Sequence, residues 1–180
     1  MSLQTERVVP LDGKPARRSF APLERLLDDM VMLVEGLDRD TYRARPLPNA
    51  SGSIGEHVRH CLDHVSALAM ARPSMPLSYD GRERGTAVET DPVEAIRQIL
   101  QLKGALERLS TRSLDEPIAV TAMLSTSGES VAGWSTLARE LAFVVSHTIH
   151  HQAMIGVLLS VYGIDTPDRF GHSPSTPRRH

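Results

Sequence analysis

The sequence predicts an all-α protein, a four-helix bundle with a small β-hairpin before its last helix. Aromatic residues make up only 4% of the chain while hydrophobic residues make up 41%. A core must therefore be built from aliphatic and methionine side chains, which suits packed helices. Four segments carry apolar residues at three- and four-residue spacing, the period of a helix buried on one face. Start and stop signals for helices flank these segments.

The 180 residues divide into three parts. Residues 1–18 contain two prolines, a glycine and scattered charge, which predicts an extended lead-in. Residues 19–163 hold all four helical segments and form one domain of ordinary size. Residues 164–180 are rich in proline, serine and arginine, which predicts an irregular tail.

The first three helices are predicted by their apolar stripes and their ends. The stripe from Leu23 to Leu37 predicts a helix over about 22–37. Ser53 with Glu56 three residues later is a capping-box signal for the start of a second helix, which nearby prolines end. A third helix is expected to begin around Pro92, because proline is favoured in the first turn.

The segment 116–134 has a different pattern. Apolar residues recur at every second position and Ser127-Gly128 interrupts them, which predicts two strands joined by a turn. The last helix is expected to begin after Ser135 and to run to Tyr162, with Gly163 as its cap. This helix is apolar on most sides, so we expect it deep in the bundle. Trp134 near its start is predicted to be a packing anchor.

Charge and cysteine content exclude several classes of protein. With a net charge of −2, the chain lacks the excess positive charge that is typical of proteins that bind nucleic acid or an anionic membrane. The single cysteine, Cys61, excludes an internal disulfide and fits a reducing compartment. We expect it to be a small buried helix residue rather than a nucleophile. The N-terminus lacks the apolar core of a signal peptide, and no apolar run approaches the ~20 residues that span a bilayer. We therefore expect a cytoplasmic protein.

Six of the eight histidines fall in two short windows, 57–64 and 147–151. Residues four apart on a helix share a face, with Cβ atoms ~5–6 Å apart. His147 and His151 have that spacing and share a stripe with core-type residues. Imidazoles on a buried face need partners for their nitrogens, and a metal ion bound at ~2.0–2.1 Å is one such partner. The pattern therefore predicts His147 and His151 as metal ligands.

The second helix is expected to supply the third ligand, and spacing alone does not choose it. His57 and His64 lie nearer the apolar arc than His60 does. His60 is four residues from His64 and from a glutamate, so each of these pairs shares a face. All three histidines remain candidates at this point.

A resemblance adds to this pattern. Residues 53–60 (SIGEHVRH) and 147–152 (HTIHHQ) resemble the second-helix opening and the last-helix motif of the DinB/YfiT-like superfamily of metal-dependent enzymes. The likeness covers the chain from about Phe20 to Tyr162. It implies an up-down-down-up bundle, a homodimer, and a metal site whose ligands are His60, His147 and His151. The chain departs from the family motif by three further histidines that are able to share or replace a ligand: His57, His64 and His150.

Three neutral imidazoles plus water form an open coordination set that suits Zn, with Ni or Fe(II) as alternatives. The resemblance implies an enzyme that activates water or a low-molecular-weight thiol for transfer, isomerisation or hydrolysis of a small-molecule substrate. The alternative is a non-catalytic helical module whose metal site is structural or sensory and is closed by a fourth ligand.

The chain has no His-Glu-x-x-His motif and no glycine-rich phosphate loop, which argues against a zincin protease and a nucleotide-binding fold.

Four further residues are candidates for the site. Glu140 lies on the stripe of His147, two turns earlier, where a carboxylate is able to orient a ligand; an ion pair with an arginine is the alternative. The long polar connector 72–90 contains Tyr79, Arg82 and Arg84, which we expect to contact substrate, because arginines bind carboxylates and phosphates. A solvated connector is the alternative for these three residues.

Overall fold

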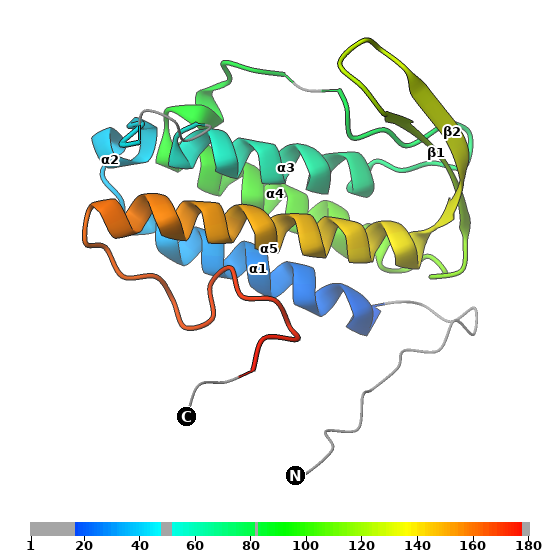
Figure 1. The fold of residues 1–180 in the computed structure, drawn as a ribbon. Helices are drawn as coiled ribbons and strands as arrows, with labels where there is room; N and C mark the ends of the chain where they lie inside the picture. The colour runs from blue at the N-terminus through cyan, green and yellow to red at the C-terminus, as the bar shows by residue number, and fades with distance from the viewer. Residues whose placement is uncertain (1–16, 48–51, 82, 178–180) are drawn as a thin grey trace.

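The computed structural model describes residues 17–47, 52–81 and 83–177 (Figure 1), so the expected lead-in lies almost wholly outside the described residues. The elements in chain order are α1 (Arg17–Glu35), α2 (Arg39–Arg43), α3 (Ile54–Ala69), the 3-10 helix η1 (Ala87–Glu89), α4 (Pro92–Leu109), β1 (Pro117–Met123), β2 (Ser130–Thr136) and α5 (Leu137–Val161). The fold is mostly helical with one antiparallel hairpin directly before the last helix, as the sequence predicts. The short helices α2 and η1 were not predicted.

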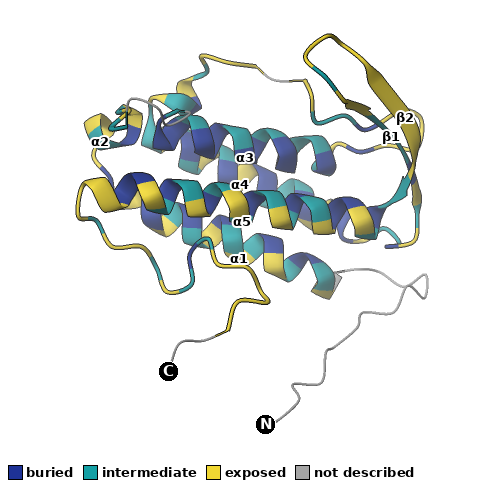
Figure 2. Ribbon diagram, in the orientation of Figure 1, coloured by how far each residue is buried: buried dark blue, intermediate teal, exposed yellow. Residues whose placement is uncertain are grey.

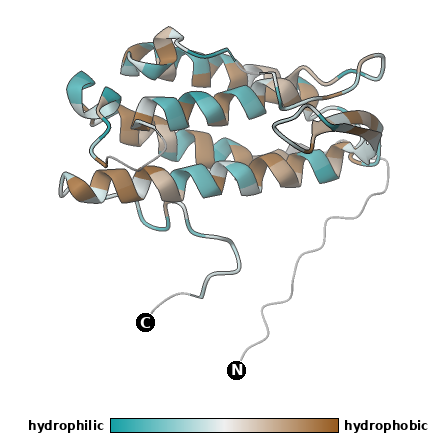
Figure 3. Ribbon diagram, turned by 45° about the horizontal axis from the view of Figure 1, so that its top comes forward, coloured by the Kyte–Doolittle hydropathy of each residue, from teal (hydrophilic) through white to brown (hydrophobic). Residues whose placement is uncertain are grey.

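The four long helices lie side by side and share one core (Figure 1). Helix α3 contacts α4 and α5, and α1 contacts the same two helices from the other side. Their buried residues face inward (Figure 2), and apolar residues form stripes along the helices (Figure 3). Fully buried core side chains come from every long helix, among them Phe20, Leu27, Ile54, Leu62, Ile99, Leu106 and Leu137.

The start of α3 is fixed by its first residues. The Ser53 hydroxyl accepts a hydrogen bond from the Glu56 N–H at 3.2 Å, and the Glu56 carboxylate accepts one from the Ser53 N–H at 2.7 Å, so the predicted capping box is formed. A Cβ atom on Gly55 would lie 2.1 Å from the carbonyl oxygen of Glu89. Only glycine therefore lets α3 begin this close to η1, and this contact sets the position of the α3 histidines.

The described segment after α5 packs against the helices. Phe170 is buried, and the Gly171 N–H donates to the side-chain oxygen of Gln152 at 3.4 Å. Gln152, itself fully buried on α5, donates to the carbonyl oxygen of Leu26 at 2.9 Å. These contacts join the C-terminal segment, α5 and α1.

Helix α5 is less deeply buried than the sequence predicts. By length and composition alone it is apolar enough to cross a membrane, but a core helix passes the same test, and 33% of its most apolar window is buried. One face is exposed, including Ala142, Ser146 and Val157. The expectation that Trp134 anchors the packing is wrong, because 76% of Trp134 is exposed. It lies on the hairpin strand β2, which is exposed from residue 130 to residue 134.

Candidate metal centre

Helices α3 and α5 bring six histidines together where they pack against each other. His57, His60 and His64 follow one another at spacings of three and four on α3, and His147 lies three residues before His150 and four before His151 on α5, so each series lies on one side of its helix. We call the set the histidine cluster; it consists of His57, His60 and His64 on α3, and His147, His150 and His151 on α5.

Three members of the cluster form the tightest group. One ring nitrogen each from His60, His64 and His147 lies within 4.8 Å of the others. The Nε2 atoms of His60 and His147 are 3.0 Å apart, near the ~3.3 Å between two nitrogens on one tetrahedral zinc ion. Nδ1 of His64 lies 3.0 Å from the His60 carbonyl oxygen, so Nδ1 donates there and Nε2 is the nitrogen available for coordination. The group fits a divalent metal ion.

His151 lies beside this group without belonging to it. Its ring centre is 4.6 Å from that of His147 and 4.5 Å from that of His60. Its Nδ1 is 3.0 Å from Nδ1 of His57. The structure thus brings the three expected ligands together and places His64 among them. The assignment of His151 as the third ligand stays a prediction.

The cluster favours neutral imidazoles, the form that binds metal. Burial, with smaller contributions from His147 and other neighbouring histidines, lowers the pKa of His151 to about 3. Burial also lowers the pKa of His57, which is 5% exposed. Nε2 of His57 is buried and has no hydrogen-bond partner among the residues that the structure describes. Such an atom is costly unless something at the site satisfies it.

Two aromatic rings cover one side of the cluster. Tyr79 stacks on His64 with ring centres 5.1 Å apart and planes 4° apart, so this expected site residue does reach the histidines. Phe143 stacks on His147 at 5.7 Å. Burial, followed by the charge of Glu140, raises the pKa of Tyr79, so its phenol stays neutral. Phe143 was missed by the sequence analysis, although it lies four residues before His147.

The sequence match agrees with this geometry. Residues 22–155 match the DinB superfamily, which is more than half of the chain. The chain belongs to the DinB superfamily. A stretch of 101 residues is also 34% identical to FK506-binding protein 5 of Rhizopus delemar, covering 56% of this chain and 26% of that protein. This DinB protein therefore spans about a quarter of the length of that relative.

The remaining expected site residues of this DinB protein have different surroundings. Glu140 is buried, and its carboxylate accepts a hydrogen bond from the Ser135 hydroxyl at 2.6 Å and lies 3.5 Å from the Arg139 guanidinium. These partners match the ion-pair alternative for Glu140. Arg84 is exposed in the connector after Tyr79. Arg82 lies outside the described residues.

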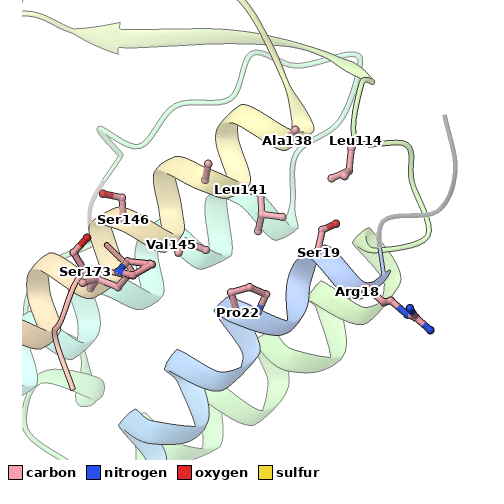
Figure 4. A pocket seen from close by; sticks show the side chains of 12 residues that line it. Arg18, Ser19, Pro22, Leu114, Ala138, Leu141, Val145, Ser146 and Ser173 are labelled. Atoms are coloured by element: carbon pink, nitrogen blue, oxygen red, sulfur yellow. The ribbon is translucent and has the colours of Figure 1, made fainter. Parts of the chain in front are cut away.

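A cavity of about 530 Å³ lies on another face of α5, away from the histidine cluster (Figure 4). It is bounded by the start of α1, by α5 and by the C-terminal segment at Ser173. Its walls are mostly apolar, and among the described residues that line it Arg18 is the one charged residue. This cavity holds no histidine of the cluster and is separate from the metal centre.

Proposed function

We propose that this DinB protein is a metal-dependent enzyme whose divalent ion is held by His60, His147 and His151. The observation that supports this set best is the arrangement of the three rings. Their centres form a nearly equilateral triangle, with sides of 4.9 Å, 4.6 Å and 4.5 Å, and their planes cross at 72°, 63° and 83°.

This triangle is close to what one ion requires. Imidazoles bound to one tetrahedral ion have ring centres on the order of 5 Å apart. The rings of His64 and His147 are stacked only 3.8 Å apart and 22° from parallel, which is too close for neighbouring corners of a tetrahedron. We therefore assign the third position to His151, which would bind the ion through Nε2. Its Nδ1 is already engaged by His57.

His60, His147 and His151 would hold Zn²⁺, Ni²⁺ or Fe²⁺, which would lower the pKa of water or of a low-molecular-weight thiol and so supply a nucleophile or base for transfer, isomerisation or hydrolysis. The protein residues position and enclose this site. His57 orients His151, as hydrogen-bonded partners of metal ligands commonly do. Tyr79 and Phe143 restrict solvent access on one side and form an apolar wall for a small-molecule substrate.

A second candidate function is a non-catalytic module with a structural or sensory metal site. The observation in its favour is His64, which completes the tightest nitrogen group. If His64 joins the other three histidines, four imidazoles close the coordination set, and no position is left for a substrate.

Metal analysis of untagged protein separates these proposals. We expect one equivalent of metal in wild type, and its loss in His60→Ala, His147→Ala and His151→Ala. His64→Ala should keep its metal if the site is open and lose affinity if the site is closed. His150→Ala is the matched control, because His150 is an exposed histidine of the same helix. Stoichiometric metal in His147→Ala would rule out the site.

Three further proposals accompany this one. The contacts among α1, α3, α4 and α5, together with the directions in which these helices run in Figure 1, support a four-helix bundle with up-down-down-up connectivity. The family resemblance supports a homodimer, which light scattering of the purified protein would test. The single cysteine, Cys61, which fits a reducing compartment, supports a cytoplasmic location.

A further inference from the structure

A second hollow lies beside the histidine cluster, between the hairpin and the first turns of α5. This hairpin cavity has a volume of about 320 Å³, at the small end of the range for ligand pockets. Tyr79, Trp134 and Phe143 all line it. The whole chain has only one tryptophan, three tyrosines and three phenylalanines, so this cavity gathers an unusual share of them.

The hairpin cavity and the metal centre share a wall. Tyr79 and Phe143, whose rings are 5.0 Å apart, line the cavity and also stack on two histidines of the cluster. A molecule in the cavity therefore contacts the same two aromatic rings that contact His64 and His147. This arrangement places an apolar compartment next to the metal centre.

Among the described residues, the lining of the cavity includes one cation, Arg139, and one carboxylate, Glu140. The side chain of Arg139 is 64% exposed, and its guanidinium carbon lies 5.3 Å from the centre of the Phe143 ring. A guanidinium has five N–H donors, and the recorded contact with Glu140 at 3.5 Å uses only one nitrogen. Glu140 is itself buried and hydrogen-bonded to Ser135. Arg139 is thus held over the ring by a neighbouring carboxylate and has donors left for a planar anion.

We propose that the hairpin cavity binds a small carboxylate with a flat apolar body. The carboxylate pairs with Arg139, and the body lies between Trp134 and Phe143. Its role as the substrate rests on the proposed metal-dependent function, but its binding does not require the ion.

Trp134 makes the test direct, because it is the chain's one tryptophan and lines the cavity. Its fluorescence is titrated at pH 7 with 3-phenylpropanoate, and in parallel with the neutral 3-phenylpropanamide. We expect a saturable change with the acid and affinity at least about tenfold weaker for the amide, because the charge-assisted pair is lost. Arg139→Gln should weaken binding of the acid by a similar factor. Arg139→Lys should weaken it by less, because lysine keeps the positive charge although it lacks the planar fork of donors.

Arg97→Gln is the matched control. Arg97 is also exposed, 55%, and pairs with a glutamate of its own helix, but it lies on α4. It should bind the acid as wild type does. Equal affinity for acid and amide, unchanged binding in Arg139→Gln, or tighter binding of phenyl phosphate than of the acid would overturn the proposal.

Metal content measured on the same samples keeps this inference distinct from the proposed function. Saturable binding of the acid to protein that takes up no metal would leave the cavity assignment standing and refute the enzyme proposal. Stoichiometric metal with no saturable response to the acid would refute the cavity assignment and leave the proposed metal site standing.

Discussion

Replacing Arg59 tests its ion pairs, one of which joins α3, which carries three of the clustered histidines, to η1. Arg59 is 8% exposed on α3; its Nε donates to Glu89 of η1 at 2.8 Å, and its Nη1 pairs with Asp63. Arg59→Met leaves these two carboxylates, with side chains 12% and 20% exposed, without their cation. Removing one partner of a buried ion pair costs about 3–5 kcal/mol. Because both carboxylates keep some contact with water, we expect about 3 kcal/mol.

Urea unfolding in the presence of a chelator at pH 7 measures this change. Arg97→Met is the control, because its exposed pair with Glu94 should contribute at most about 1 kcal/mol. Adding Glu89→Gln to Arg59→Met should restore part of the stability, since one uncompensated charge is removed. If Arg59→Met lowered the free energy of unfolding no more than Arg97→Met does, the ion pairs of Arg59 would not stabilise the packing of η1 against α3.

Three further predictions concern stability. Gly55→Ala should lower the free energy of unfolding by more than about 2 kcal/mol in urea, because its Cβ would meet backbone at 2.1 Å. Leu106→Ala should cost about 2–5 kcal/mol since this side chain is fully buried, whereas Leu100→Ala, at a position 57% exposed, should stay within about 0.5 kcal/mol. Acidification should destabilise chelator-treated protein, because the pKa of His151 is about 3 when folded and ~6.5 when unfolded. The stabilisation is present above pH ~6.5 and is lost as the pH falls toward 3, by less than about 1.4 kcal/mol per pH unit because the ring is partly exposed; His151→Gln should flatten this slope.

Much of the helical framework was predictable because its signals are local. Each signal lies within a few residues of the structure that it predicts: the capping box at Ser53, the proline at the start of α4, and the alternating residues of the strands. Helix α2 escaped prediction because it is five residues long and has no apolar stripe, although Asp38 caps it. The exposure of Trp134 depends on what covers the hairpin, which no local pattern records.

The site was predictable only as far as one helix determines it. The four-residue spacing of His147 and His151 predicted that they share a face, because both lie on α5. The choice among the α3 histidines depends on how α3 is rotated against α5, and the packing of two whole helices sets that angle. Contact of Tyr79 with His64 depends on the path of a long connector. The family resemblance supplied His60 where spacing could not, and the structure places its Nε2 3.0 Å from that of His147.

Metal binding should be strongly coupled to the stability of this protein. Two pairs of histidine nitrogens lie 3.0 Å apart, and each pair needs one N–H between them, while Nε2 of His57 is buried without a hydrogen-bond partner in the described residues. A cation bound by His60 and His147 would take the place of the proton that their two Nε2 atoms share, and would offset the cost of crowding there. Zn²⁺ at a hundred times its dissociation constant should therefore raise the free energy of unfolding by about 2.7 kcal/mol. Thermal unfolding with and without Zn²⁺ measures this gain, which should vanish in His147→Ala and persist in His150→Ala. An equal rise in His147→Ala would mean that the ion binds elsewhere, and the convergence of the two helices would then have no bearing on metal.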